Sequence, residues 1–314
     1  MLADVYRLVS PAGARARLSI LIFHRVLPQP DPLLPWDPDT ARFDAILRFI
    51  GEHFVVLPLR DAVERLQRGD LPAAAACITF DDGYADNVTL ALPSLQRHGL
   101  HATFFIATAF LDGGRMWNDD VIEAVRTIPP GRLDLRDLGL AEYEIGDSAS
   151  RVEGYTTMLN GLKYLDHRRR AEIAAEIARR SGVPIASSLM MTTRQLRELH
   201  AAGFEIGGHT CTHPILENLA DRDAEREMAD GKDRLESLLG SRVECFAYPN
   251  GLPGKDYSAR HAEMAKRVGF STAVSTFMAA ARRGADVYQL PRFLPWGRSR
   301  MRFAARWAMQ LARS

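Results

Sequence analysis

Short runs of apolar, β-branched and aromatic residues alternate along this chain with longer segments of helical periodicity. The short runs predict strands at residues 19–23, 54–57, 76–80, 103–107, 204–206, 243–247 and 271–274. The longer segments predict helices at residues 40–51, 59–68, 87–98, 119–128, 192–202, 221–239 and 257–268. Alternation of this kind is typical of parallel β/α units. Seven predicted strands in a chain of 314 residues favour an α/β fold built as a TIM-like (β/α)7 barrel over an open sheet.

Two helix starts can be located from their capping residues. Thr192 and Gln195 match the capping-box pattern, and Gly203 follows at the distance expected of a helix stop. Asn87 is predicted to cap the helix that runs towards Gly99.

The regular alternation is interrupted between residues 113 and 191. This region contains a Pro-Pro-Gly sequence at 129–131, an irregular acidic stretch at 134–147 and a helical run at 162–180. We expect a largely helical insertion, packed over one mouth of the barrel, within a single domain that spans residues 1–314. Residues 298–314 predict a basic amphipathic helix, which either closes the barrel or lies on an anionic membrane surface.

Composition narrows the class of protein without identifying it. Apolar residues make up 46% and charged residues 25% of the chain, as in soluble globular proteins. Forty basic and thirty-nine acidic residues leave a net charge of +1, which argues against a nucleic-acid partner. Three cysteines provide no disulfide framework, and the first twenty residues hold no apolar run of signal-peptide length. We therefore expect a cytoplasmic protein, with peripheral contact to the inner membrane through the tail helix as an alternative. No protein partner can be inferred.

The predicted strand at 76–80 runs directly into two carboxylates. Asp81 and Asp82 follow it and precede Gly83. In parallel β/α proteins, active sites form at the carboxyl ends of the strands. Adjacent carboxylates repel each other, and a bound cation offsets that repulsion. Taken alone, such a pair more often belongs to a helix cap or a polar loop.

A second polar segment follows the predicted strand at 204–206. His209 and His213 are spaced as in zinc proteases, but Pro214 disfavours a helix there and no glutamate follows His209. We therefore expect a loop that turns both imidazoles towards the barrel mouth, with two ordinary loop histidines as the alternative. Together with Asp82 they make a set of three protein ligands that leaves metal positions open.

The sequences TFDDG at 79–83 and HTCTH at 209–213 resemble the polysaccharide deacetylase (NodB-like) family, carbohydrate esterase family 4. The resemblance covers approximately residues 19–295 and implies a distorted (β/α) barrel that removes N-acetyl groups from a carbohydrate. It implies Asp82, His209 and His213 as metal ligands and Asp81 as the catalytic base. One divalent cation is expected; zinc is the first choice, and nickel, cobalt or iron(II) would accept the same ligands.

A third family motif, Arg-x-Pro-aromatic-Gly, is altered in this chain. It corresponds to residues 247–251, where Ala247 stands in place of the arginine that orients the base. The resemblance assigns the backbone N–H of Asn250 as a donor to the oxyanion. Arg292 is the candidate replacement for the missing arginine, and a surface arginine without this role is the alternative.

The histidine that usually serves this family as general acid, near the carboxyl end, is also missing, because no histidine follows His261. His24 instead ends the first predicted strand. This position resembles the subgroup that deacetylates poly-N-acetylglucosamine exopolysaccharides, in which the acid comes from the N-terminal strand. The resemblance implies that His24 protonates the leaving amine, and a purely structural histidine is the alternative.

Further side chains are expected to contact the sugar because aromatic faces suit carbohydrates. The candidates, each with core packing as its alternative, are Tyr84, Trp117, Tyr248 and Trp296. Cys211 lies between the two histidines and is expected to be buried and inert, since Asp82 already completes the ligand set.

The leading hypothesis is a metal-dependent N-deacetylase that acts on an N-acetylated polysaccharide or on a lipid- or nucleotide-linked precursor. A cytoplasmic location favours the precursor. One alternative is a glycan-binding relative that has lost turnover, for which Ala247 is the argument. Another is a non-haem iron oxygenase with two histidines and one carboxylate, which the order of the ligands along the chain disfavours.

Overall fold

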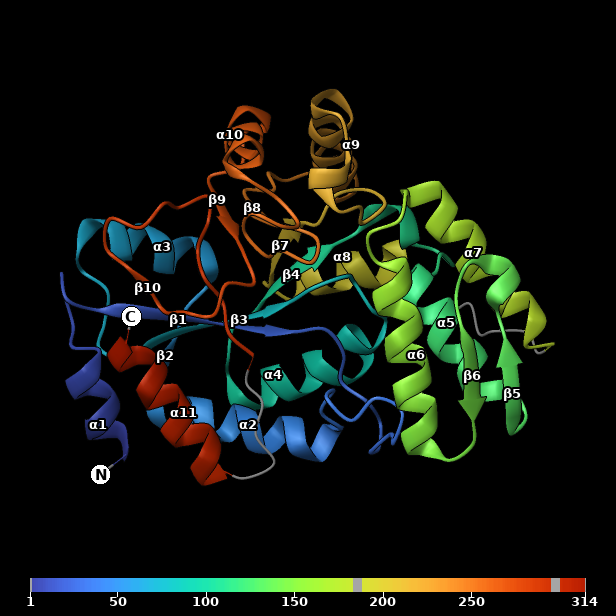
Figure 1. Cartoon of the computed structure of the whole chain (residues 1–314). Helices are drawn as coiled ribbons and strands as arrows, with labels where there is room; N and C mark the ends of the chain where they lie inside the picture. Colours follow the sequence, from blue (N-terminus) through green and yellow to red (C-terminus); the bar gives the residue numbers. More distant parts are fainter. Residues whose placement is uncertain (1, 183–187, 295–299, 314) are drawn as a thin grey trace.

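The computed structural model describes residues 2–182, 188–294 and 300–313. Figure 1 shows a curled sheet with helices around it and a separate group of elements on the right. The strands of the main sheet are β1 (Arg17–Phe23), β2 (Val55–Val56), β3 (Ala75–Phe80), β4 (Thr103–Ile106), β7 (Glu205–Gly208), β8 (Cys245–Ala247), β9 (Thr272–Val274) and β10 (Ala281–Arg282). The α-helices are α1 (Leu2–Val9), α2 (Thr40–His53), α3 (Leu59–Arg68), α4 (Leu92–His98), α5 (Trp117–Thr127), α6 (Ser148–Leu162), α7 (His167–Arg180), α8 (Thr193–Ala201), α9 (Asp221–Leu239), α10 (Ala259–Val268) and α11 (Arg300–Arg313).

The main sheet follows the order β10-β1-β3-β4-β7-β8-β9, and β2 pairs with β3 beside this path. Every pairing is parallel except that of β10 with β1. All seven predicted strands are present. The chain has the distorted α/β barrel that was expected, with a strongly curled mixed sheet.

A short segment between β10 and α11 links the two edges of this sheet. Leu290 forms an isolated parallel bridge to Val274 after β9, and Phe293 forms one to Leu21 in β1. The backbone hydrogen bonds include Leu290 N–H to the carbonyl of Ala273 and Phe293 N–H to the carbonyl of Ile20, at 3.0 and 2.9 Å. Residues 290–293 therefore close the barrel.

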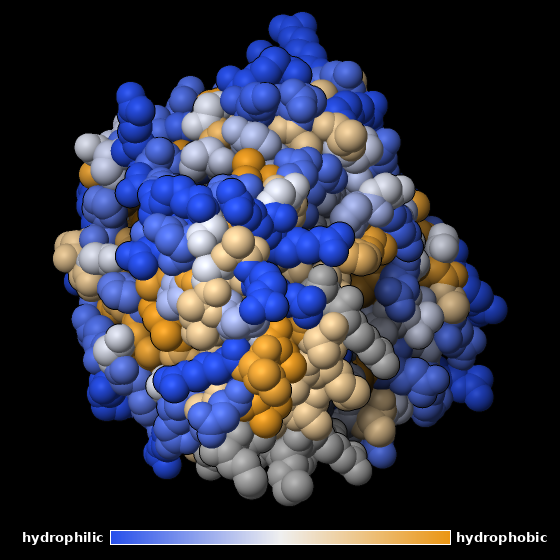
Figure 2. All heavy atoms as spheres, turned by 90° about the vertical axis from the view of Figure 1, so that its left-hand side faces the viewer, coloured by the Kyte–Doolittle hydropathy of each residue, from blue (hydrophilic) through white to orange (hydrophobic). Residues whose placement is uncertain are grey.

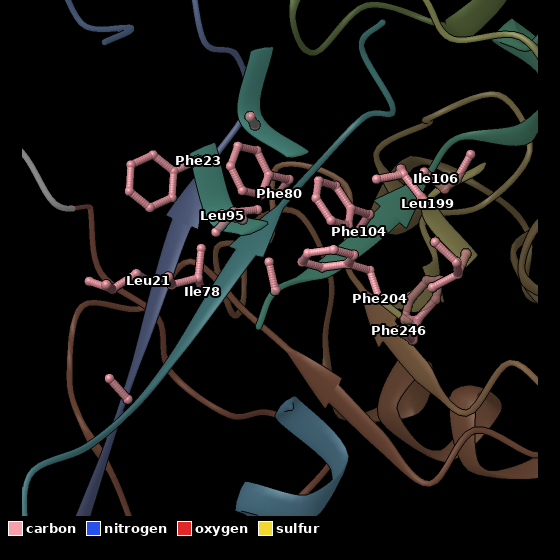
Figure 3. Packing of buried hydrophobic residues seen from close by; sticks show 14 of the residues in the cluster. Leu21, Phe23, Ile78, Phe80, Leu95, Phe104, Ile106, Leu199, Phe204 and Phe246 are labelled. Carbon is pink, nitrogen blue, oxygen red and sulfur yellow. The ribbon is translucent and has the colours of Figure 1, made fainter. Parts of the chain in front are cut away.

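Alternating residues of the strands supply two separate apolar clusters. The larger cluster lies between the sheet and helices such as α2, α4 and α8, and Figure 3 shows its aromatic centre. The rings of Phe23 and Phe80 stack with centroids 5.3 Å apart, and those of Phe80 and Phe104 stack at 4.9 Å. Close packing of these rings fixes the relative positions of β1, β3 and β4, whose carboxyl ends carry the polar side chains discussed below.

The region predicted as an insertion forms a group with its own core. Apolar residues of α5, α6 and α7 and of the hairpin β5 (Gly131–Asp134) and β6 (Glu142–Ile145) make up this core. Two details of the prediction were wrong. The stretch at 134–147 is not wholly irregular, because it contains the end of β5 and all of β6, which pair as a hairpin. The helix predicted at 162–180 begins at His167, where the carboxylate of Asp166 accepts hydrogen bonds from two backbone N–H groups.

Of the two predicted helix starts, one is confirmed and one was wrong. Thr192 and Gln195 form the predicted capping box at the start of α8. Asn87 does not cap a helix; it begins a π-helical turn, Asn87–Ala91, that leads into α4. Its side-chain amide instead donates a hydrogen bond to the carbonyl of His24 at 2.9 Å.

Helices α1 and α11 pack together on the face shown in Figure 2. The side chain of Trp307 on α11 is buried; its ring stacks on Phe54 at 3.9 Å and its Nε1–H donates to Ser19 Oγ at 2.8 Å. The described apolar side chains exposed on these two helices are Val5, Leu8 and Met309, and Figure 2 shows hydrophobic residues within a mostly hydrophilic face. Helix α11 thus covers the barrel, and membrane contact through it stays a prediction. Among the described helices, none combines the length and hydrophobicity needed to span a bilayer.

Candidate active site

The carboxyl ends of the parallel strands converge on one pocket of about 380 Å³. His24 follows β1, Asp81 and Asp82 follow β3, and the two histidines follow β7. These side chains line the pocket together with residues from the β8 and β9 loops, the closing segment 290–293 and the insertion. The lining residues are Ile22, His24, Asp81, Asp82, Met116, Trp117, Asn118, Leu159, Asn160, Lys163, His209, His213, Asn250, Thr276, Met278, Arg292 and Leu294.

Three predicted metal ligands meet at one side of this pocket. Ligand atoms of Asp82, His209 and His213 all lie within 4.8 Å of one another. The Nε2 atoms of both histidines are 3.4 Å from Oδ1 of Asp82. One carboxylate and two imidazoles in this arrangement form a facial set of ligands for a divalent cation and leave positions open for water or substrate.

The environment of these side chains fits a cation. Asp82 Oδ1 is buried without a hydrogen-bond partner in the described structure, although unsatisfied buried oxygens are costly. Burial alone would raise the pKa of Asp82, but contact with His209 outweighs it and holds the pKa well below its usual range. Burial lowers the pKa of His213 to about 3, so its imidazole is neutral, as a metal ligand must be.

The tautomer of His209 is set by the backbone. Its Nδ1 lies 2.7 Å from the carbonyl oxygen of Ala247, and because a carbonyl only accepts, Nδ1 carries the proton. In the neutral imidazole that a metal requires, this tautomer leaves the lone pair on Nε2, the nitrogen nearest Asp82. Ala247 thus keeps a role in this site through its backbone, although its side chain cannot replace that of an arginine.

The loop between the two histidines is held by a carboxylate on α9. Glu227 accepts hydrogen bonds from the N–H groups of Cys211 and Thr212 at 2.9 and 2.8 Å. Gly231 on the same helix lets the loop approach closely, because a Cβ there would lie 2.9 Å from the backbone carbon of Thr210. The loop conformation was predicted, but Glu227 was missed because no local motif marks a helix residue as a loop anchor.

Cys211 in this loop is half-buried rather than buried. Burial raises the pKa of its thiol, which keeps it protonated at neutral pH. A protonated thiol is a poor nucleophile, which agrees with the expectation that Cys211 is inert. The prediction that Cys211 is fully buried was wrong.

Arg292 lies on the closing segment and forms a bidentate pair with Asp81. Its Nη1 and Nη2 donate to the two carboxylate oxygens at 2.7 and 2.8 Å, and its Nε donates to the carbonyl of Ser275 at 2.9 Å. The guanidinium is fully buried. Burial alone would raise the pKa of Asp81, but the charge of Arg292 and its hydrogen bonds hold the pKa below its usual value. Asp81 is therefore a buried, ionised and oriented carboxylate beside the metal position.

Asn250 occupies a tight turn after β8 with a positive φ of 60°. Thr276 fixes this turn, because its Oγ1 donates to the carbonyl of Asn250 at 2.7 Å and its N–H donates to that of Gly251 at 2.8 Å. Gly251 also has positive φ, and a Cβ there would lie 2.9 Å from the carbonyl oxygen of Tyr248. The turn brings Asn250 to the pocket wall.

His24 is half-buried on the pocket wall near the same carboxylates. Its backbone is held by Asn87, which also donates to Asp86 at 3.2 Å. A third carboxylate lies close by: burial raises the pKa of Asp37 to about 6, although the charge of His24 acts in the opposite direction. Neither Asn87 nor Asp37 was identified from the sequence, because their partners are distant along the chain.

The insertion also supplies part of the pocket wall. Trp117 and Asn118 at the start of α5 and Asn160 and Lys163 at the end of α6 line the pocket. Trp117 was predicted to contact the sugar, and its indole lies under the guanidinium of Arg170 at 4.7 Å. The other three side chains were missed because the insertion matches no motif.

Two of the predicted sugar-binding aromatic residues lie elsewhere. Tyr248 is fully buried, with its ring stacked on Tyr257 at 3.8 Å. Tyr84 is buried beneath Arg25, and its hydroxyl donates to Asp119 at 3.1 Å. Direct sugar contact by either residue was a wrong prediction, because core packing uses both rings. Trp296 lies outside the described residues.

Comparison with known proteins places this geometry in a family context. A family model described as "Polysaccharide deacetylase" matches residues 68–128 and 162–273. YxkH of Bacillus subtilis (strain 168), provisionally described as a polysaccharide deacetylase, is 22% identical over 279 residues, which are 88% of this chain and 71% of YxkH.

Two solved structures share the fold. The deacetylase PplD of Streptococcus pyogenes, solved with acetate, gives a TM-score of 0.60 at 19% identity over 89% of this chain and 92% of PplD. IcaB from Ammonifex degensii gives a TM-score of 0.60 at 19% identity over 96% of this chain and 98% of IcaB.

Proposed function

Since the chain belongs to the polysaccharide deacetylase family, we propose that it is a metal-dependent N-deacetylase that hydrolyses the acetamide of an N-acetylated sugar. The substrate would be a polysaccharide or a glycan intermediate of its biosynthesis. One observation carries the proposal: three ligand atoms for a cation converge beside a buried carboxylate that an arginine holds in place.

Asp82, His209 and His213 would hold the cation. A divalent ion bound there would supply Lewis-acid activation of water and of the acetamide carbonyl. The ligand set fits zinc, and nickel, cobalt and iron(II) remain alternatives.

The residues around the cation would divide the proton transfers between them. Asp81, ionised and oriented by Arg292, would accept the proton of the attacking water. The N–H of Asn250, presented by its tight turn, would donate to the oxyanion as the carbonyl carbon becomes tetrahedral. His24, on the pocket wall, would protonate the nitrogen as the carbon–nitrogen bond breaks, which gives acetate and an amine.

The geometry argues against the alternative hypothesis that the protein binds glycans without hydrolysing them. That alternative rested on Ala247, because a base without its arginine would be poorly oriented. The bidentate pair between Arg292 and Asp81 supplies the same interaction from another strand end. We therefore favour the enzyme.

Acetate release tests the proposal. We expect the purified protein to release acetate from N-acetylglucosamine oligosaccharides. Acetate release should stop when a chelator removes the metal and should resume when metal is added back. Asp81→Asn should lower the rate about 10²- to 10⁴-fold. Asp223→Asn, which alters an exposed carboxylate in the first turn of α9, is the matched control and should keep full activity. Full activity in Asp81→Asn would rule out the assigned base.

A further inference from the structure

The part of the pocket wall that comes from the insertion carries a positive charge without an acidic partner among the described residues. Lys163 lines the pocket at the end of α6 and is half-buried. The only carboxylates among the described lining residues are Asp81, which pairs with Arg292, and Asp82, which faces the metal position. No ion pair forms between Lys163 and an acidic group within the described part of the chain.

A second cationic side chain lies next to the end of α6. Arg170 on α7 is only 2% exposed, and its Nη1 donates to the carbonyl of Lys163 at 3.1 Å. Its Nε is buried without a partner in the described structure, and burial lowers its pKa to about 10. Its guanidinium also lies over Trp117. Arg170 thus fixes both the end of α6 and the indole, and it adds positive charge to this side of the pocket.

A structural role alone does not account for Lys163. Its ammonium lies 5.3 Å from the centroid of the Tyr164 ring, which is a weak contact because that ring is itself 39% exposed. A half-buried lysine with no acidic partner among the described residues loses part of its hydration, and this weak contact does not offset that cost. A negatively charged group in the pocket would offset it.

We propose that Lys163, together with Asn118 and Asn160, forms a subsite for an anionic group on the glycan beside the acetylated sugar. The group is a carboxylate, as in a uronic acid, or a phosphate. An ammonium and two carboxamides provide donors suited to such oxygens, and all three side chains line the same pocket as the candidate metal ligands. The inference rests on the proposed function, because it defines which sugar polymer or precursor the same pocket accepts.

The subsite also predicts what is rejected. A neighbouring glucosamine carries an ammonium, which Lys163 would repel. Substrates should therefore rank in the order anionic, neutral, cationic. A chain of N-acetylglucosamine should become a poorer substrate next to each sugar already deacetylated.

The test uses four disaccharides that share N-acetylglucosamine and differ in the neighbouring sugar: glucuronate, glucose 6-phosphate, glucose or glucosamine. With the metal-loaded protein, we expect kcat/KM for the better anionic substrate to exceed that for the glucose compound about tenfold, as for one charge-assisted hydrogen bond. The better of the glucuronate and phosphate arms identifies the source of the anion. Lys163→Met should abolish the ranking, and Lys163→Glu should reverse it. Lys266→Met, which removes an exposed lysine from α10, is the matched control and should preserve it.

Calorimetric binding of the same disaccharides to the metal-free protein separates this inference from the proposed function. One outcome is that no substrate releases acetate, but the anionic compounds bind more tightly than the neutral one and lose this advantage in Lys163→Met. The subsite then stands and the deacetylase assignment fails. Equal kcat/KM for the neutral and anionic compounds, with equal binding, would overturn the subsite. An anion preference that survives in Lys163→Met would do the same.

Discussion

The pair of Arg292 and Asp81 gives the most stringent prediction, because both groups are buried and each is the other's main partner. Arg292→Met removes the guanidinium and leaves a side chain of similar length. Two charge-assisted hydrogen bonds, of 2.7 and 2.8 Å, are lost, and Asp81 remains as an unpaired carboxylate that is 3% exposed. Breaking one partner of a buried pair typically costs about 3–5 kcal/mol in the free energy of unfolding.

The double variant separates the pair from its surroundings. Asp81→Asn alone leaves the arginine buried without its counter-charge, so it should also destabilise the protein. When Asp81→Asn and Arg292→Met are combined, no unpaired charge remains, and the loss should be smaller than the sum of the single losses by roughly 2–3 kcal/mol. Urea unfolding of the metal-free proteins measures all four states without a contribution from metal binding.

The pH dependence gives a second readout. Asp81 has a lowered pKa in the folded protein, so its contribution to stability is present above the carboxyl range and is lost as the pH falls through the folded value. The stability difference between wild type and Arg292→Met should therefore be largest near neutral pH and shrink in acid. In the metal-loaded enzyme, the acidic limb of kcat/KM should move to higher pH in Arg292→Lys, which keeps the charge but loses the bidentate geometry. Additive single losses together with an unmoved acidic limb would refute the reasoning.

Three further predictions concern the metal, the acid and the core. Glu227→Ala should weaken metal affinity about tenfold, measured by competition with a chelating dye, because it frees the loop between the two histidines; unchanged affinity would exclude the anchor. His24→Gln should lower kcat about 10²-fold on an N-acetyl sugar but much less on nitrophenyl acetate, whose leaving group needs no proton; equal losses would count against an acid. Trp307→Ala should lower the free energy of unfolding by about 3–5 kcal/mol in a denaturant titration while activity per folded molecule persists; a loss below about 1 kcal/mol would contradict its place in the core.

The fold and the candidate metal ligands were predictable because their signals are local. Each apolar strand is followed directly by its polar residues, so the order of residues along the chain is enough to assign Asp82 and His209 to strand ends. The capping box at Thr192 is local as well. Arg292 was named as the candidate replacement for the arginine missing at position 247, and the structure brings it to Asp81.

Interactions between distant segments were not predictable from one sequence. The amide of Asn87 matched a helix cap locally, but its partner is the carbonyl of His24, which directly follows β1. Lys163 belongs to a region with no motif, and only the packing of α6 brings it to the pocket. Tyr248 follows a strand end as a sugar-binding ring might, yet stacking on Tyr257 draws it into the core.

The closing segment, residues 290–293, comes late in the sequence but contributes a side chain to the candidate site. All three metal ligands lie before residue 214, so a nascent polypeptide that is still being translated already contains the means to hold a cation. The side chain that aligns Asp81 is made much later, on the strip of backbone that joins β1 to β9. On the proposed mechanism, a shortened protein that lacks residues 290–293 would keep the three candidate ligands but lose the side chain that aligns Asp81, so we expect it to hydrolyse no substrate.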